Sequence, residues 1–147
     1  MKSKRRYNKE KKHVYYTIGY SKVLHREDGP AVIFDYEEGE DRIELWYRYN
    51  LLHRIDGPAY NDFDGEKRWY VNRLLHRKDG PAIEHPYGNY VWYIDGKRHR
   101  LDGPAAIYSN GDLEWWINGV KYDKEKFFES LTSEQKQKIL FSEYFIK

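Results

Sequence analysis

One seven-residue motif, His-Arg-x-Asp-Gly-Pro-Ala, constrains the fold of this chain more than any other feature of its sequence. It occurs four times, with spacings of 28, 23 and 23 residues between copies that begin at His25, His53, His76 and His99. An aromatic pair follows each copy, and the tryptophans that open these pairs lie 23 residues apart, at Trp46, Trp69, Trp92 and Trp115. A fixed period of this length is typical of repeat proteins, in which each unit packs against the next one in the sequence.

The residues of one repeat predict a β-hairpin. Proline suits the first position of a strand because it donates no ladder hydrogen bond, so we expect a strand to open at each Pro-Ala. A turn follows at Gly65, Gly88 and Gly111, and the returning strand carries the aromatic pair. The His-Arg-x-Asp-Gly residues then form a second turn. Five additional residues around Gly39 predict a longer first hairpin, and residues 15–20 predict a leading half-unit.

Alternation along the returning strands divides their side chains between two faces. We expect the core face to carry Trp69 and Val71, then Tyr90, Trp92 and Ile94, then Leu113, Trp115 and Ile117. The opposite face carries a row of rings at equivalent positions, named here the aromatic row, which comprises Tyr47, Tyr70, Tyr93 and Trp116. Tyr and Trp concentrate binding energy at interfaces, so the aromatic row predicts a partner-binding face. The alternative is that helices cover it.

The hydrophobic period changes to that of a helix beyond residue 122. Asp123 is a candidate N-cap, and Thr132 with Gln135 matches a capping box. We expect two short helices, over about 124–130 and 133–145. They are expected to cap the sheet with Phe127, Phe128, Leu131, Leu140 and Phe141. The alternative is that they dock a partner.

Together these patterns predict a mainly β protein, an elongated antiparallel sheet of stacked β-hairpin repeats with a short C-terminal helical cap. We expect a basic, flexible tail over residues 1–13, a repeat sheet of four hairpins over 14–122, and helices that pack on the end or the face of the sheet over 123–147. The 147 residues suffice for one domain, and the 18% aromatic content suits strands.

Charge is distributed unevenly along the chain. Residues 1–13 hold seven Lys or Arg and one Glu, a net charge of +6, which leaves −4 for the remaining residues of a chain whose total is +2. Contact with a polyanion is therefore expected to begin in this segment, at Lys4, Arg5, Arg6, Lys11 and Lys12. The alternative is a tail that only promotes solubility.

The recurring His, Arg and Asp residues are expected to be structural, because a catalytic group is needed once whereas a framework contact recurs with the repeat. Equivalent histidines two strands apart lie about 10 Å from one another, too far to share a metal ion. The chain has no Cys, and its serines and glycines lack the nucleophile-elbow and phosphate-loop contexts. We expect no catalytic residue, no metal and no cofactor.

The motif is instead expected to act as a clasp on its own turn. An Asx-turn would use the N–H two residues after the Asp, but that residue is proline. The candidate donors are the arginine two residues before each Asp, or the Arg and His of an adjacent repeat. The aspartates are Asp28, Asp56, Asp79 and Asp102, and the arginines before them are Arg26, Arg54, Arg77 and Arg100.

The repeat, read over residues 92–111 as Trp-Tyr-x-x-Gly-Lys-x-His-Arg-x-Asp-Gly-Pro-Ala and a later Gly, resembles a MORN repeat. It is most similar to a Leu-His-Arg-x-Asp-Gly-Pro-Ala form found in uncharacterised proteins of bacteriophages and large DNA viruses, and the resemblance covers residues 14–122. It implies stacked hairpins that bind or scaffold, with lipid contact in some members, and no reaction. This chain departs from the usual pattern by placing Arg and Asp at the second turn, where Gly is common.

We therefore expect a non-catalytic protein that binds a protein partner, a phage-encoded inhibitor or adaptor acting on a host protein in the cytoplasm. The alternative is binding of nucleic acid or an anionic ligand through the basic segment and the aromatic row. A small-ligand pocket under the first hairpin is a third option. No apolar run is long enough to span a membrane, and the sheet edge offers a route to an oligomer.

Overall fold

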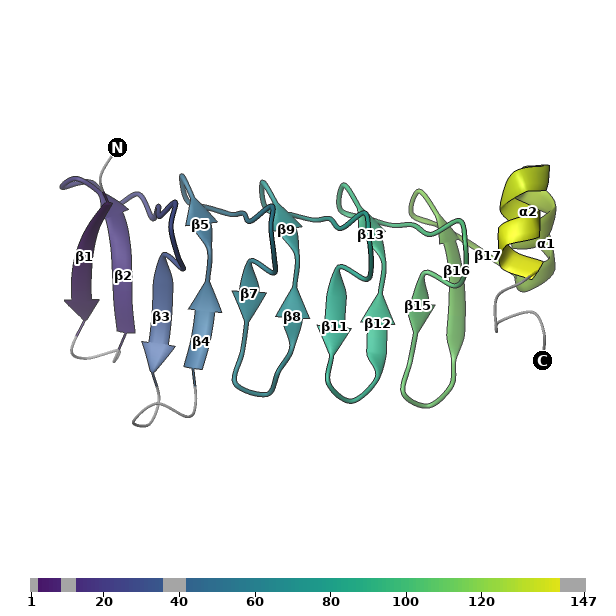
Figure 1. Ribbon diagram of the computed structural model, residues 1–147, viewed down its shortest axis with the longest axis horizontal. Coiled ribbons are helices and arrows are strands. Elements are labelled where there is room, and N and C mark those ends of the chain that lie inside the picture. The colour runs from purple at the N-terminus through teal and green to yellow at the C-terminus, as the bar shows by residue number, and fades with distance from the viewer. Residues whose placement is uncertain (1–2, 9–12, 36–41, 141–147) are drawn as a thin grey trace. The chain divides into compact units, whose positions relative to one another are not determined.

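The structure is a computed structural model that describes residues 3–8, 13–35 and 42–140 (Figure 1). The chain divides into two compact units, Met1–Leu75 and His76–Lys147. Both units consist mainly of antiparallel hairpins, and two short helices follow the last hairpin, which confirms the predicted fold class.

Unit 1 contains a main sheet with the strand order β1-β2-β3-β4-β7-β8. Its strands are β1 (Ser3–Asn8), β2 (His13–Ile18), β3 (Val32–Asp35), β4 (Arg42–Leu45), β7 (Tyr60–Asn61) and β8 (Lys67–Arg68). Neighbouring strands are antiparallel. Two small hairpins accompany the sheet, β5 (Tyr47–Arg48) with β6 (Leu51–Leu52), and β9 (Tyr70–Val71) with β10 (Leu74–Leu75).

Unit 2 repeats this arrangement and ends in the helices. Its strand order is β11-β12-β15-β16-β17, formed by β11 (Ile83–His85), β12 (Asn89–Val91), β15 (Ala106–Ile107), β16 (Leu113–Ile117) and β17 (Val120–Tyr122). A small hairpin joins β13 (Tyr93–Ile94) to β14 (Lys97–Arg98). In both units the small hairpins lie at one end of the long hairpins, opposite the long hairpin loops (Figure 1).

The small hairpins were not expected, because the returning strands looked continuous through the aromatic pair. Each small hairpin turns on two residues that both have positive φ, at Tyr49-Asn50, Asn72-Arg73 and Asp95-Gly96, and the turn from β16 to β17 is of the same kind, at Asn118-Gly119. Such turns match the right-handed twist of the strands they connect, and Asp-Gly and Asn-Gly are their strongest sequence signals. Those two signals were present in the chain, whereas Tyr49 and Arg73 occupy turn positions that their residue types seldom adopt.

The core differs from the predicted core face. The alanines of the four Pro-Ala pairs are fully buried, at Ala31, Ala59, Ala82 and Ala105. The N–H of Trp92 donates to the carbonyl of Ala105 at 2.8 Å, which brings the backbones of successive hairpins together. A small side chain suits such a close, fully buried approach of two backbones, which is consistent with the recurrence of alanine there.

The predicted alternation is also wrong in the last two long hairpins. Val91 is buried, although period two places it on the face opposite to Tyr90 and Trp92, while Tyr90 and Leu113 are each 38% exposed. The physical reason is that β12 ends at Val91, so the period-two pattern does not continue through Trp92. Val91 lies opposite Ala106 and shares its buried face, and Trp115 is buried as expected.

The prediction of a flexible tail over residues 1–13 is wrong for its described residues. Ser3–Asn8 form β1, which pairs with β2 and completes the predicted half-unit as a full hairpin. Arg6 explains part of the pairing, because its Nε donates to Thr17 Oγ1 at 3.1 Å. Tyr16 occupies the position of the repeat's Trp, since its N–H donates to the carbonyl of Ala31 as the N–H of Trp46 donates to Ala59.

The helices begin where the sequence predicts, at α1 (Lys124–Ser130) and α2 (Ser133–Leu140). The capping box is present, since Thr132 N–H donates to Gln135 Oε1 and Gln135 N–H donates to Thr132 Oγ1. Asp123 is the N-cap of α1, although its side chain makes no capping hydrogen bond. No helix within the described ranges is long and apolar enough to cross a membrane.

The cap buries a slightly different set of side chains from the predicted one. Phe127, Leu131 and Ile139 pack with Trp115 in one cluster. Leu140 is 52% exposed, because the stripe of α2 that faces the cluster passes through Ile139 instead. Phe128 is partly buried, and Phe141 lies outside the described residues.

Candidate binding site

The Arg-Asp clasp predicted within each turn is present in all four copies of the motif. The Nε of each arginine donates to the Asp two residues later, at 2.9, 2.9, 3.2 and 2.7 Å for Arg26–Asp28, Arg54–Asp56, Arg77–Asp79 and Arg100–Asp102. The same guanidinium also donates from Nη1 to the proline carbonyl of its motif, as from Arg100 to Pro104 at 3.2 Å. Each arginine thus donates hydrogen bonds to two parts of its own turn, the Asp carboxylate and the proline carbonyl.

The glycine of the motif makes room for this guanidinium. A Cβ placed on Gly103 would lie 2.9 Å from Cζ of Arg100, and one on Gly57 would lie 2.8 Å from Cζ of Arg54. The same guanidinium groups contact an aromatic ring of the preceding hairpin. Arg100 Cζ lies 4.0 Å from the Trp92 ring centroid, and Arg54 Cζ lies 3.8 Å from that of Trp46. The clasp therefore links successive hairpins as well as closing its own turn.

Acid is expected to weaken the clasps of unit 1. The hydrogen bond from Arg26 lowers the pKa of Asp28, and that from Arg54 lowers the pKa of Asp56. A carboxylate whose pKa is lower in the folded state contributes stability above its unfolded pKa of about 3.9, and this contribution is lost as the pH falls through the folded value. The melting temperature should therefore drop from pH 5 toward pH 2, with a shallower drop in the variant Asp28→Asn/Asp56→Asn. Identical pH profiles for the two proteins would contradict this role.

The histidines of the motif bind the next small hairpin. Nδ1 of each ring accepts a hydrogen bond from a turn N–H in the following repeat, at 3.1–3.3 Å, for His25–Tyr49, His53–Asn72, His76–Asp95 and His99–Asn118. These histidines are thus framework residues, as their recurrence predicted. Among the described residues, no three His, Cys, Asp or Glu side chains gather as metal ligands would.

The residue between Arg and Asp is the one interior position of the motif that differs in every copy, as Glu27, Ile55, Lys78 and Leu101. Ile55 is 79% exposed, and Glu27 and Lys78 are exposed as well. The clasp fixes the backbone on both sides of this position. An unchanging framework therefore presents a different exposed side chain in each of the first three copies, whereas Leu101 in the fourth is partly buried against the helical cap.

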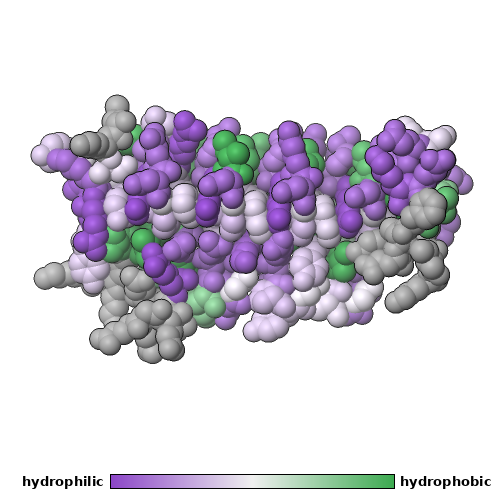
Figure 2. Space-filling view, in the orientation of Figure 1, coloured by the Kyte–Doolittle hydropathy of each residue, from purple (hydrophilic) through white to green (hydrophobic). Residues whose placement is uncertain are grey.

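A groove lies between successive motif turns in each unit. In unit 1 it has a volume of about 490 Å³ and is lined by residues that include Arg26, Trp46, His53, Ile55 and the Arg54–Asp56 clasp. In unit 2 it has a volume of about 780 Å³, between the turns at 77–81 and 99–102, with Trp92 and α2 beside it. On the face shown in Figure 2, hydrophilic side chains recur over successive hairpins. The sequence did not predict these grooves. The one signal that it contained was the residue between Arg and Asp, which differs in every copy of the motif.

The aromatic row lies on the small hairpins and on β16, and its rings are half-buried. In unit 1, burial raises the pKa of Tyr47. In unit 2, Arg98 Nε donates to the hydroxyl of Tyr93, and Trp116 Nε1 donates to Glu114 Oε2. The polar atoms of Tyr93 and Trp116 therefore already form hydrogen bonds within the chain. A partner would contact these two residues through the exposed parts of their rings.

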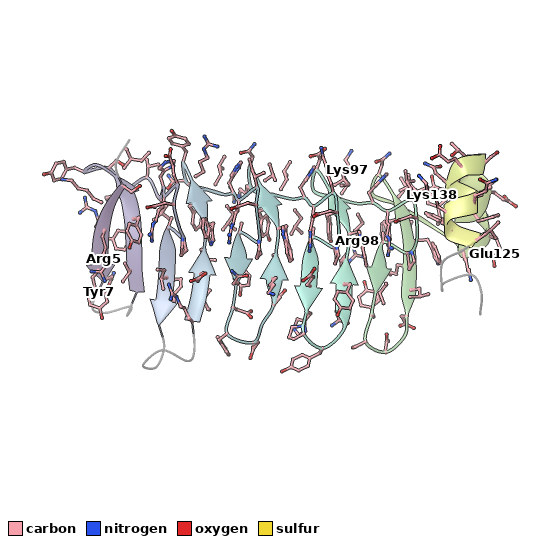
Figure 3. All side chains as sticks on the ribbon, viewed as in Figure 1. Arg5, Tyr7, Lys97, Arg98, Glu125 and Lys138 are labelled. Carbon is pink, nitrogen blue, oxygen red and sulfur yellow. The ribbon has the colours of Figure 1, made fainter. Side chains whose placement is uncertain are left out.

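Glu114 connects several side chains of this region in unit 2. Its carboxylate accepts hydrogen bonds from Arg98, Lys121 and Tyr108 in addition to Trp116. The hydrogen bond from Lys121 is the largest cause of the lowered pKa of Glu114. Figure 3 shows Arg98, together with its neighbour Lys97, on the small hairpin. This cluster holds Tyr93 and Trp116 in fixed orientations.

The predicted polyanion-binding residues are partly brought together on β1. Lys4 and Arg5 are exposed, and Lys4 Nζ lies 3.4 Å from the ring centroid of Tyr20. Arg6 is instead half-buried against Thr17, which leaves it less free to meet a ligand. Figure 3 shows Arg5 and Tyr7 on this strand, which begins the strand order of unit 1. Lys11 and Lys12 lie outside the described residues.

No family model, no curated protein and no solved structure matches this chain.

Proposed function

We propose that this protein is a non-catalytic binding protein that recognises a partner protein through the grooves between its motif turns. The observation that carries this proposal is the division of labour within the motif. Its recurring Arg, Asp and His side chains bond to the protein's own turns, whereas the residue between Arg and Asp changes from copy to copy and is exposed in the first three copies. Variable side chains on loops held by a rigid framework are a common basis of recognition.

The resemblance to MORN repeats supports a role in binding or scaffolding. Because the most similar form of the repeat occurs in phage and large DNA virus proteins, we infer an inhibitor or adaptor that acts on a host protein in the cytoplasm. The aromatic row is the second surface that suits a protein partner, since half-buried Tyr and Trp rings lose little conformational entropy on binding.

Affinity capture from a bacterial lysate tests the proposal and separates the two surfaces. We expect Ile55→Ala or Lys78→Ala to lose a prey protein that the unchanged protein retains, because these side chains are exposed in the grooves. Lys67→Ala on β8 is the matched control, since Lys67 is exposed but lines neither groove. Loss of the prey only with Tyr70→Ala and Tyr93→Ala would assign binding to the aromatic row. Retention by all variants would contradict both surfaces.

A second candidate function is binding of a polyanion at β1, favoured by the exposed cations Lys4 and Arg5 beside Tyr7 and Tyr20. We expect a fluorescent single-stranded DNA to bind at low salt and to be released steeply toward physiological salt, because counterion release drives such binding. Lys4→Glu/Arg5→Glu should abolish it, and Lys67→Glu should not. Equal binding by the two variants would exclude β1 as the site.

A further inference from the structure

We propose that the groove of unit 2 binds an extended acidic segment of the partner protein, one with carboxylates on both sides of an apolar residue. This inference rests on the proposed function and specifies the chemistry of the partner. Three features carry it: the cations left after the clasps are formed, the apolar wall between them, and the exposed aspartates at the rim.

The residues that line the groove include four cations and two carboxylates. Arg77 and Arg100 are paired with Asp79 and Asp102, and Arg77 also pairs with Glu84 outside the lining, which leaves Lys78 and Lys138 as the additional cations among the lining residues. Within the described part of the chain, no ion pair involves Lys78.

Lys138 projects from α2 toward the hairpins (Figure 3) and pairs with Glu134 at 3.0 Å. Both of these side chains are largely exposed. Such a surface pair contributes little to stability, so a carboxylate of the partner can replace Glu134 at low cost.

Apolar side chains line the groove between these two lysines. Trp92, Ile94 and Leu101 form this wall, and Leu101 also packs against the buried cluster that contains Phe127. The wall is therefore held in place by the helical cap. The groove has a volume of about 780 Å³. This volume accommodates a short stretch of extended chain that places one apolar side chain on Trp92.

The rim favours a peptide over a nucleic acid. Asp79 and Asp102 line the same groove and are 85% and 65% exposed at their side chains. A nucleic acid strand carries a phosphate at every nucleotide and would place some of them against these carboxylates. A peptide carries carboxylates only at chosen positions, alternate residues of an extended chain lying about 7 Å apart, and its backbone N–H groups can donate to the two aspartates.

Fluorescence anisotropy with the full chain and a labelled peptide tests this inference. The probe is the peptide Gly-Glu-Glu-Leu-Glu-Glu-Gly, and its controls are the peptides with Lys in place of Glu and with Ser in place of Leu. We expect the acidic peptide to bind at least about tenfold more tightly than the basic one at physiological salt, because opposite charges must meet across the groove. The Ser peptide should bind more weakly than the Leu peptide.

Charge reversal in the groove locates the site. We expect Lys78→Glu/Lys138→Glu to lose at least about tenfold in affinity for the acidic peptide with an unchanged melting temperature, whereas Lys67→Glu binds as the unchanged protein does. Equal binding of acidic and basic peptides, no effect of the double variant, or displacement of the peptide by an oligonucleotide of equal length would overturn the inference. Each of those outcomes is compatible with capture of a prey protein through Ile55 in the groove of unit 1. The proposed function is therefore tested separately from this inference.

Discussion

Phe127→Ala is expected to lower the free energy of unfolding of unit 2 by about 3–5 kcal/mol, the usual cost of deleting a buried aromatic ring. Phe127 is fully buried and its ring centroid lies 4.9 Å from that of Trp115. It joins α1 to the last long hairpin in a cluster with Leu131 and Ile139. Urea unfolding followed by tryptophan fluorescence measures the change directly, because Trp115 adjoins the deleted ring.

Leu140→Ala is the matched control for this variant, because Leu140 ends α2 but is 52% exposed. We expect it to cost less than about 1 kcal/mol, since most of its side chain already contacts water. A similar cost for Phe127→Ala and Leu140→Ala would mean that α1 and α2 do not cap the hairpin through the buried cluster.

Arg100→Ala is expected to cost about 2–4 kcal/mol, from a buried carbonyl left without its donor and from a lost contact with an aromatic ring. The carbonyl belongs to Pro104, which is fully buried, and the ring belongs to Trp92. Thermal unfolding of the full chain should show a clearly lowered midpoint. Arg100→Lys should recover little of the loss, because an ammonium group has neither a planar face to stack on the ring nor donors fixed in the fork that reaches both acceptors.

Two further variants separate the parts of this clasp. Asp102→Ala should destabilise less than Arg100→Ala, since the carboxylate is 65% exposed and water can replace it. Gly103→Ala should destabilise because its Cβ would lie 2.9 Å from Cζ of Arg100 and displace the guanidinium. If Gly103→Ala unfolds at the same temperature as the unchanged protein, the close approach of guanidinium and glycine is not required.

The features that the sequence predicts well are those that repeat or that depend on near neighbours. The 23-residue period predicts the long hairpins, and the Arg-x-Asp spacing predicts the clasp, because both partners lie within one turn. Thr132 and Gln135 predict the start of α2 for the same reason, since the capping box is complete within four residues.

The features that the sequence does not predict depend on contacts between distant residues. The basic composition of residues 1–13 suggested a tail, yet Ser3–Asn8 form a strand because β2 supplies an antiparallel partner. The core alanines are equally inconspicuous until the backbone of Trp92 is seen to approach Ala105. The grooves arise only when two motif turns lie next to each other, so one repeat read alone contains no sign of them.

The central claim is that a motif arginine contacts the ring of the preceding hairpin, as Arg26, Arg54 and Arg100 do. This contact makes the recurring residues a framework and leaves the variable ones for binding. A double-mutant cycle on Arg100→Ala and Trp92→Leu in urea unfolding measures this contact. We predict a coupling energy of about 0.5–2 kcal/mol between the two side chains. Free energy changes that add without coupling would contradict the account.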